Sequence, residues 1–253
     1  MIVIDVGNTN IVLGVYSNTK LKKIFRFNSK SILTIKEIKK KFTKNYILKL
    51  DLDFNICIIS SVVIGLDIKI KDIFEKINLK IKNISYKNLP IKIKFDIDNP
   101  HELGNDRIAN SIAAINKYGK NCLVIDFGTA TTFDVIQNFE YKGGVIAPGI
   151  NASHDTLVQN ASRLKKIKFL KTNKVVGKNT IKAMQSGFYW GYVGLINGIV
   201  KRILIERKFK PCVILTGGLA NLYKKEIIIK TYHEPDLTLE GLYHIGINLN
   251  DRS

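Results

Sequence analysis

The sequence is poor in cysteine and in acidic residues, and it has no long apolar stretch. Its 253 residues include three cysteines, five prolines and one tryptophan. The longest apolar run, Ile56 to Leu66, contains two serines and a glycine, and it falls short of the ~18 residues that a membrane span requires. The first ten residues reach Asp5 without a basic segment, unlike a secretory signal. We therefore expect a cytoplasmic protein with no membrane partner.

The few cysteines and histidines do not form a recognisable metal or disulfide pattern. Each of Cys57, Cys122 and Cys212 lies in a short apolar run, and their odd number without a CxxC pair predicts neither a disulfide framework nor a zinc site. The four histidines share no metal-ligand spacing. We expect buried, reduced thiols.

Acidic residues are outnumbered, since 21 Asp and Glu stand against 40 Lys and Arg and give a net charge of +19. Such a charge is found in proteins that bind nucleic acids or membrane surfaces. Here the lysines are scattered over amphipathic segments, where a solvated face is expected, and no RNA-binding or zinc-finger motif accompanies them. We therefore do not expect a nucleic acid partner, although the positive field would attract anionic ligands such as nucleotides.

The most informative feature that is present is an internal repeat. Residues 2–10 and 123–132 both read as an apolar strand, then Asp-x-Gly, then small polar residues. Asp5 and Asp126 are 121 residues apart, which is nearly half of the chain. This spacing favours two similar halves, which we place at residues 1–110 and 111–253.

Each half continues with strands and then alternates helices with strands, which indicates an α/β fold. Expected strands cover residues 11–16, 21–27, 55–60, 79–85, 132–136, 141–146 and 211–215. Expected helices cover residues 35–48, 67–77, 104–118 and 179–207, the last with four glycines along it. The stretch from Tyr86 to Pro100, with two prolines, is the expected linker.

The two Asp-x-Gly turns have the composition of phosphate-binding turns. Backbone N–H groups around a glycine can hold phosphate oxygens, and Asn8, Thr9 and Asn10 add side-chain donors in the first turn. Asp5, at the end of a strand, can hold a hydrated Mg²⁺ against those phosphates. A plain β-hairpin would also explain one such turn, but two of them half a chain apart favour a clamp on one polyphosphate.

In the second turn, Asp126 and Gly128 are followed by Thr129, Ala130 and two further threonines, whose hydroxyls can donate to phosphate. Later, Thr216-Gly217-Gly218 follows an apolar strand. Glycines at such a place let a ribose or a flat ring approach the backbone. Behind two phosphate turns, this segment is interpreted as the nucleoside end of the same site.

These residues carry a resemblance to the actin/hexokinase/Hsp70 superfamily and, within it, to the type III pantothenate kinases. The matching blocks, in order, are Asp5–Asn10, Gly104–Arg107, Asp126–Thr132, Gly143–Gly149, Thr216–Gly218 and Leu237–Leu242. The resemblance implies two similar actin-like (ribonuclease H-like) lobes, each a mixed sheet with flanking helices, with ATP in the cleft. It implies ATP-dependent phosphorylation of pantothenate to 4'-phosphopantothenate, the first step of coenzyme A biosynthesis.

The resemblance also implies roles for single residues. The implied ATP-binding residues are Asp5, Val6, Gly7, Asn8, Thr9, Asn10, Gly128, Thr129, Gly217 and Gly218. The implied pantothenate-binding residues are Gly104, Asn105, Asp106, Arg107 and Thr180, with Asp106 as the base that faces the primary hydroxyl. Asp126 would hold K⁺ or NH₄⁺, and the family forms homodimers. From the residues alone, Asp106 and Thr180 can equally be ordinary first-turn residues of helices.

Three positions depart from the family pattern. Asn105 stands where the family has a small Ala, Ile97 where a Tyr is frequent, and Leu164-Lys165 where Leu-Pro is usual. These departures concern the pantothenate site and not the phosphate turns.

Besides the kinase, the sequence allows a non-catalytic nucleotide-binding regulator, like the transcription-activator relatives of the family, and another sugar or acetate kinase. The retention of the charged residues of both turns and of the Gly104–Arg107 block favours the pantothenate kinase.

Overall fold

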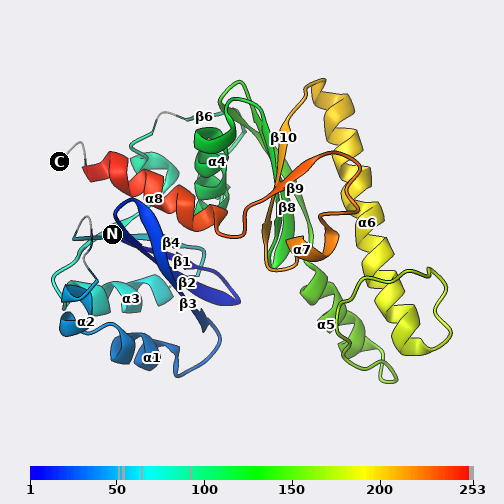
Figure 1. Ribbon diagram of the computed structural model, residues 1–253, viewed down its shortest axis with the longest axis horizontal. Coiled ribbons are helices and arrows are strands. Elements are labelled where there is room, and N and C mark those ends of the chain that lie inside the picture. Colours follow the sequence, from blue (N-terminus) through cyan, green and yellow to red (C-terminus); the bar gives the residue numbers. More distant parts are fainter. Residues whose placement is uncertain (51, 53–54, 64, 92, 251–253) are drawn as a thin grey trace. The chain divides into compact units, whose positions relative to one another are not determined.

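The computed structural model describes residues 1–50, 52, 55–63, 65–91 and 93–250, and the chain divides into two compact units (Figure 1). Unit 1 consists of Met1–Asn116 together with Leu237–Ser253, and unit 2 is Lys117–Asp236. The boundary expected between residues 110 and 111 therefore lies at Asn116, and the C-terminal segment, which we expected in the second half, returns to the first unit.

Unit 1 is built on a five-stranded mixed sheet in the order β3-β2-β1-β4-β5. The first three strands form an antiparallel meander, and β4 and β5 run parallel to β1. One face packs on α1, α2 and α3, and the other face packs on α8 (Figure 1). The bounds are β1 Ile2–Val6, β2 Asn10–Ser17, β3 Lys20–Asn28, α1 Thr34–Lys41, α2 Lys44–Leu48, β4 Ile56–Ser61, α3 Leu66–Glu75, β5 Lys80–Asn83, α4 Asn105–Tyr118 and α8 Leu237–Asn250.

Close packing explains why the C-terminal helix belongs to unit 1. A Cβ atom built on Gly246 of α8 would lie 2.4 Å from the sulfur of Met1 and 2.9 Å from a side-chain carbon of Ile58. A Cβ atom on Gly241 would lie 1.9 Å from the carbonyl oxygen of Ala109 in α4. Glycine at both positions lets α8 approach the sheet and α4 more closely than any other residue would allow.

Unit 2 repeats this plan on a second mixed sheet, in which the strands of residues 117–236 follow the order β11-β10-β7-β8-β9. Strands β7, β8 and β9 form the antiparallel meander, and β10 runs parallel to β7. The apolar core of the unit joins this sheet to α6, with Tyr189, Ile196 and Val200 among its buried residues. The bounds are β7 Cys122–Phe127, β8 Ala130–Gln137, β9 Glu140–Pro148, α5 Ile150–Asn160, α6 Thr180–Arg207, β10 Cys212–Gly217, α7 Ala220–Tyr223 and β11 Thr231–His233.

The internal repeat of the sequence is present in the backbone. Strands β2 and β8 both have 8 residues, and β3 and β9 both have 9. Each second hairpin turns through two residues of positive φ, Asn18 and Thr19 in unit 1 and Asn138 and Phe139 in unit 2. Two such residues are typical of type I′ turns, which match the twist of a hairpin. The prediction of two similar α/β halves from the repeat is thus confirmed.

Two expected elements differ from the structure. The helix expected over residues 35–48 is divided into α1 and α2, because Thr43 leaves the helical conformation and its side chain accepts a hydrogen bond from the Tyr46 N–H. The expected linker lies inside unit 1. It begins with the 3₁₀ turn Tyr86–Asn88, contains a short strand, β6 Lys94–Phe95, and ends where the 3₁₀ turn Pro100–Glu102 begins.

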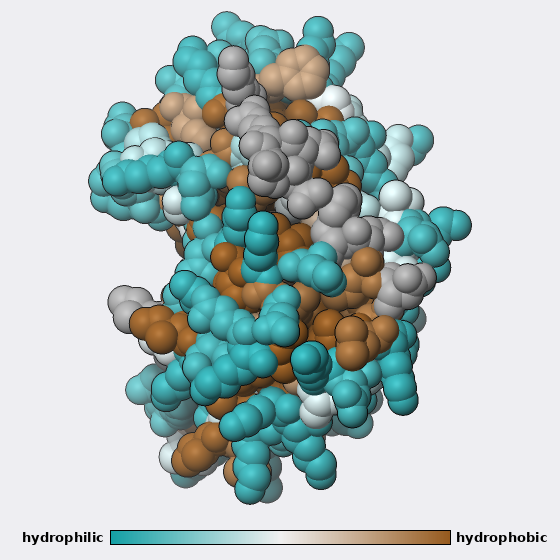
Figure 2. All heavy atoms as spheres, turned by 90° about the vertical axis from the view of Figure 1, so that its left-hand side faces the viewer, coloured by the Kyte–Doolittle hydropathy of each residue, from teal (hydrophilic) through white to brown (hydrophobic). Residues whose placement is uncertain are grey.

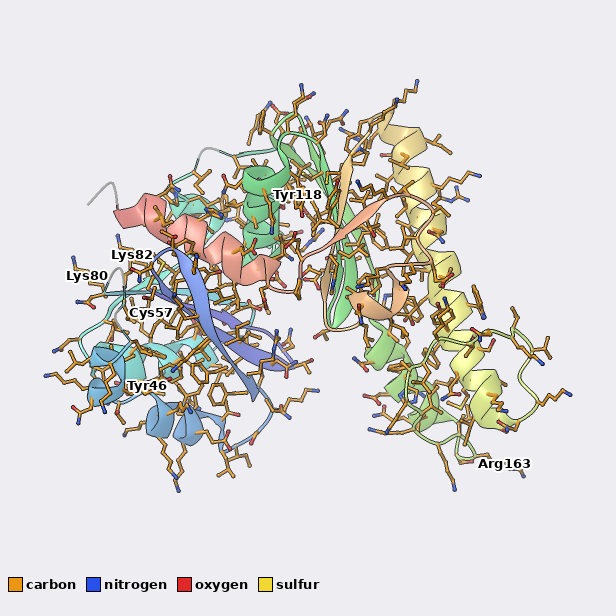
Figure 3. The ribbon with its side chains drawn as sticks, in the orientation of Figure 1. Tyr46, Cys57, Lys80, Lys82, Tyr118 and Arg163 are labelled. Atoms are coloured by element: carbon orange, nitrogen blue, oxygen red, sulfur yellow. The ribbon has the colours of Figure 1, made fainter. Side chains whose placement is uncertain are left out.

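The basic residues lie largely on solvated surfaces, as the scatter of lysines predicts. Figure 2 shows one face of the molecule, which is mostly hydrophilic with apolar patches between the charged side chains. Lys80 and Lys82 lie on β5, an edge strand of unit 1 (Figure 3). Lysine on an edge strand discourages pairing with other chains. Among the described residues, none of the helices combines the length and the apolar character of a membrane span.

Candidate functional site

The first Asp-x-Gly turn is held closed by its own backbone and by the residue that follows β3. The Gly7 N–H donates to the Asn10 carbonyl at 3.0 Å, and Asn8, Thr9 and Asn10 are exposed. Ser29, which the sequence did not single out, fastens this turn. Its hydroxyl donates to the Gly7 carbonyl at 2.6 Å and its N–H to the Thr9 carbonyl at 3.0 Å. The turn therefore presents several polar groups to a ligand from a fixed backbone.

Val6 was predicted to bind ATP, but its side chain is fully buried in the core of unit 1. Any contact of Val6 with a nucleotide is therefore limited to its backbone. Asp5 precedes it at the carboxyl end of β1, where its side chain is half-buried. In open α/β sheets, this end of parallel strands is where ligands bind.

The predicted substrate loop lies at the same sheet edge as Asp5. The Asn105 amide donates to the Ser61 carbonyl at the end of β4, with an N···O distance of 3.4 Å. A Cβ atom on Gly104 would lie 3.8 Å from Val62, whose N–H donates to the Val6 carbonyl. Because β4 runs parallel to β1, unit 1 brings the first turn and the Gly104–Arg107 loop to one edge of its sheet.

Asp106 lies in the first turn of α4, where both interpretations of the sequence placed it. Its Oδ1 accepts a hydrogen bond from the Arg107 N–H at 2.8 Å, and its side chain is half-buried. A Cβ atom on Gly104 would lie only 2.5 Å from that oxygen, so the glycine makes room for the carboxylate. The positive end of the α4 dipole favours a negative charge here. Asp106 thus caps the helix and still leaves its second carboxylate oxygen for another contact.

The second Asp-x-Gly turn is one residue shorter than the first. The Gly128 N–H donates to the Ala130 carbonyl at 3.0 Å, and Gly128 and Thr129 are exposed. The threonines that follow are not equivalent, contrary to the expectation that all could donate to phosphate. Thr132 is half-buried, and Thr131 is 1% exposed with its hydroxyl inside unit 2. Thr129 is therefore the threonine of this run that is open to a phosphate.

Two glycines of unit 2, one in the second turn and one on the distant strand β10, lie beside Asp126. A Cβ atom built on Gly217 would lie 2.5 Å from Asp126 Oδ1, and Gly217 has a positive φ of 88°. A Cβ atom built on Gly128 would lie 3.6 Å from the same oxygen. The pairing of β10 with β7, which places Thr216 beside Asp126, produces this arrangement. Without side chains on these glycines, the backbone lies close to a half-buried carboxylate, whose oxygens can face a cation or accept from a phosphate-bound water.

Gly149 also contributes to this turn, although no role was predicted for it. It precedes α5, and a Cβ atom on it would lie 2.0 Å from the Thr129 carbonyl oxygen and 2.9 Å from that of Gly128. The N-terminus of α5 therefore lies against the second turn, and its free N–H groups make this region favourable for anions. The signal was a glycine directly after a strand and before a helix in a block already matched to the family.

Gly218 is exposed and lies beside a polar pocket of about 340 Å³. Glu226 in this pocket accepts hydrogen bonds from the Lys171 ammonium at 2.6 Å and from the Tyr189 hydroxyl at 2.9 Å. The hydrogen bond from Lys171, followed by that from Tyr189, lowers the pKa of the Glu226 carboxyl. The predicted nucleoside end of the site thus borders a pocket in which the Glu226 carboxylate lies with the side chains of Lys171 and Lys225.

Thr180 is the first residue of α6, and Asn179 caps that helix by accepting a hydrogen bond from the Lys182 N–H at 2.9 Å. Thr180 is exposed and lines a largely apolar groove of about 940 Å³ in unit 2. Leu157 of α5 and Met184 and Phe188 of α6 also line this groove. Thr180 and the Gly104–Arg107 loop lie in different units, as do the two Asp-x-Gly turns.

Comparison with known proteins gives a consistent assignment. The family model described as type III pantothenate kinase matches residues 1–202. A Campylobacter jejuni protein assigned to the Baf family of transcriptional activators has a similar fold, with a TM-score of 0.65, 22% sequence identity and full coverage of both chains. The ROK hexokinase of Thermus thermophilus gives a TM-score of 0.52 at 11% identity over 99% of this chain and 100% of the hexokinase.

A third similar structure contains a nucleotide. It is the activator of 2-hydroxyisocaproyl-CoA dehydratase from Clostridium difficile with bound ADPNP, with a TM-score of 0.52 and 10% identity over 100% of this chain and 96% of the activator. These likenesses show that the chain has the two-lobed fold of actin-like ATPases and sugar kinases, as the sequence predicted.

Proposed function

Because the chain belongs to the type III pantothenate kinase family, we propose that it transfers the γ-phosphoryl group of ATP to the primary hydroxyl of pantothenate and forms 4'-phosphopantothenate. The observation that supports this proposal is that each unit brings its candidate site residues together in one place. Unit 1 gathers the first turn and the Gly104–Arg107 loop at one sheet edge. Unit 2 brings the second turn and Gly217 beside the carboxylate of Asp126.

In this proposal the two Asp-x-Gly turns bind the phosphates of one ATP, and Gly217-Gly218 binds its nucleoside. The exposed donors of the first turn, Thr129, and the N-terminus of α5 against the second turn offer N–H and O–H groups to phosphate oxygens. Phosphoryl transfer requires mainly positioning and neutralisation of charge, and fixed backbone donors provide both.

Asp106 is the proposed base. Its first oxygen is held by the Arg107 N–H, so the carboxylate has one orientation and its second oxygen is available to accept the hydrogen bond of the pantothenate hydroxyl. Asp106 orients this hydroxyl and accepts its proton as the bond to phosphorus forms. Arg107 either pairs with the pantothenate carboxylate or stabilises the charge that develops on the phosphoryl group.

We also propose Asp5 as the residue that holds Mg²⁺ through water, and Asp126 as the ligand of K⁺ or NH₄⁺. A carboxylate at a strand end beside phosphate donors fits Mg²⁺, which keeps several waters and is bound through one or two carboxylates and substrate phosphates. Asp126 fits a weakly hydrated monovalent cation because its carboxylate is half-buried at the end of β7, beside the second turn and Gly217. When bound, both cations neutralise negative charge on the phosphates.

We propose that the protein is a homodimer through the face of α6. Cβ atoms built on Gly187, Gly191, Gly194 and Gly198 would meet nothing within 4 Å, apart from the helix itself, in the described part of the chain. Packing inside unit 2 therefore does not require these glycines, whereas a second helix approaching closely would. Light scattering on the purified protein tests this proposal, and a monomeric mass at micromolar concentration would contradict it.

The test of the function is release of ADP by the purified protein with Mg-ATP and pantothenate, with and without K⁺ or NH₄⁺. We expect release that depends on pantothenate and is stimulated by the cation. ATP binding without release would favour the non-catalytic regulator. Release of ADP with a different acceptor, but not with pantothenate, would support a kinase and contradict pantothenate as its substrate.

A further inference from the structure

In both units, the aspartate of the Asp-x-Gly turn has a buried hydroxyl residue directly beside it on the neighbouring parallel strand. Asp5 in β1 pairs in register with Ser60 in β4, and Asp126 in β7 pairs in register with Thr216 in β10. Ser60 is 0% exposed and Thr216 is 2% exposed. The pairing is thus part of the internal repeat, although the sequences around Ser60 and Thr216 share no obvious motif.

Strand geometry places each hydroxyl on the same side of the sheet as its aspartate. Successive side chains of a strand point to opposite faces, and Cys57 and Ile59 of β4 belong to the core shared with α1 and α3. Ser60 therefore lies on the opposite face, as Asp5 does, since its neighbours Ile4 and Val6 belong to that same core. Neighbouring strands are about 4.8 Å apart, so a change of rotamer brings the two side chains within hydrogen-bond distance.

The Ser60 hydroxyl has no hydrogen-bond partner anywhere in the described ranges, although its oxygen is buried. Such an atom is rare because a buried unpaired hydroxyl destabilises the folded state. A substitution of Ser60 by alanine would remove this unpaired hydroxyl and break no hydrogen bond. A buried serine without a partner next to a proposed ligand-binding carboxylate thus calls for a role in the bound state.

We propose that Ser60 and Thr216 are positioning residues that orient the carboxylates of Asp5 and Asp126 when Mg-ATP and the monovalent cation bind. Each hydroxyl donates to one carboxylate oxygen and leaves the other oxygen directed at the ligand. This inference rests on the proposed function, because it takes Asp5 and Asp126 as ligand-binding groups. It adds two residues, Ser60 and Thr216, that touch neither the substrate nor the cation.

The experiment measures Mg-ATP binding without pantothenate, by calorimetry and by the shift in melting temperature, Tm. In Ser60→Ala we expect an unchanged or higher Tm without ligand, because no hydrogen bond is lost, and an affinity for Mg-ATP reduced roughly tenfold, as for one hydrogen bond to a charged group. Ser60→Thr, which keeps the hydroxyl, restores the affinity. A merely structural serine would give a lower Tm and wild-type affinity, and that result would overturn the proposal.

Ser111→Ala is the matched control in unit 1. Ser111 is also 0% exposed, but its hydroxyl donates to the Arg107 carbonyl at 2.8 Å. Its removal is expected to lower Tm and leave Mg-ATP affinity unchanged. If the wild-type protein does not bind Mg-ATP at all, both this inference and the proposed function fail. If it binds Mg-ATP but does not phosphorylate pantothenate, only the proposed reaction fails and Ser60 is still tested.

Thr216→Val tests the second pair without changing the shape of the side chain. We expect a smaller rise in Tm on addition of K⁺ than in the wild-type protein, in the presence of Mg-ATP. Thr131→Val is the control, because Thr131 is a buried threonine whose register neighbour in β7 is Phe127, so that it lies on the sheet face opposite Asp126. Equal K⁺ responses in Thr216→Val and in the wild-type protein would overturn the role of Thr216.

Discussion

Asp126 and Gly217 approach so closely that a Cβ atom on Gly217 would lie 2.5 Å from the carboxylate oxygen Oδ1 of Asp126. The same Cβ atom would lie 2.6 Å from the backbone nitrogen of Phe127. Gly217 also has a φ of 88°, which other residues adopt only with strain. The candidate site of unit 2 therefore depends on the absence of a side chain on a strand that lies about 90 residues after the turn in the sequence.

Gly217→Ala is expected to destabilise the protein by about 3 kcal/mol, through backbone strain and overpacking, and to abolish K⁺ stimulation. Gly218→Ala is the matched variant, because a Cβ atom there meets nothing within 4 Å among the described residues. We expect its Tm to equal that of the wild-type protein. Denaturant unfolding compares the two. Equal stability of both variants would contradict the close approach of Asp126.

Asp106→Asn is expected to lower turnover by at least about a hundredfold, because an amide cannot accept the proton of the substrate hydroxyl. Its carbonyl oxygen can still accept the hydrogen bond from the Arg107 N–H, so we expect little change in Tm or in ATP affinity. Steady-state kinetics and calorimetry measure the two effects. Wild-type turnover in this variant would show that Asp106 is a helix cap alone.

Glu226 gives a prediction on pH. Hydrogen bonds from Lys171 and Tyr189 lower the pKa of its carboxyl in the folded protein below the unfolded value of about 4.3. The stability that Glu226 contributes is therefore present above the unfolded pKa and is lost as the pH falls through the folded pKa. The Tm difference between wild-type protein and Glu226→Gln should be largest near neutral pH and shrink in acid.

Glu75→Gln serves as the control for this pH dependence, because Glu75 forms an exposed pair with Lys71 on α3, at 3.6 Å. Exposed pairs of this kind contribute little to stability. We expect similar Tm values for Glu75→Gln and the wild-type protein across the pH range. A Tm difference for Glu226→Gln that grows in acid would reverse the predicted sign.

The cysteines should be slow to react in the folded protein. Burial, followed by the influence of Cys212, raises the pKa of the Cys122 thiol to about 12, and burial also raises the pKa of Cys57 and of Cys212. Because the thiolate is the reactive form, we expect slow labelling by a disulfide reagent at pH 8, with the half-buried Cys212 first. Denaturation should release three fast-reacting thiols. Fast labelling of Cys57 in the native protein would contradict its burial.

Local signals predicted much of the fold. The order of the main strands and helices was predicted from the duplicated strand and turn motifs, the apolar runs and the helical periodicities. This was possible because the alternation of apolar and polar residues within a short segment reflects which of its side chains are buried. The prediction of one helix over residues 35–48 was wrong at Thr43, whose side chain caps the start of a second helix, α2. Such a local hydrogen bond competes with helical periodicity and is not visible in the apolar pattern.

Long-range pairing is what the sequence alone could not supply. The register that places Thr216 beside Asp126 and Ser60 beside Asp5 joins residues that are far apart in the chain. The return of α8 to unit 1 has the same origin, since its glycines contact Met1 and Ala109. Gly149 and Ser29 were missed because their roles depend on a turn that they reach only in the folded state.

The division of the chain has a consequence for its synthesis. Unit 2 is one continuous segment, Lys117–Asp236, whereas unit 1 needs Leu237–Ser253 as well. The whole of unit 2 is therefore translated before α8, and one face of the first sheet lacks its helix until then. Until α8 emerges, Met1, Gly14 and Ile58 have no Leu239 or Gly246 to cover them. A nascent chain of this protein thus exposes an apolar sheet face to chaperones late in translation.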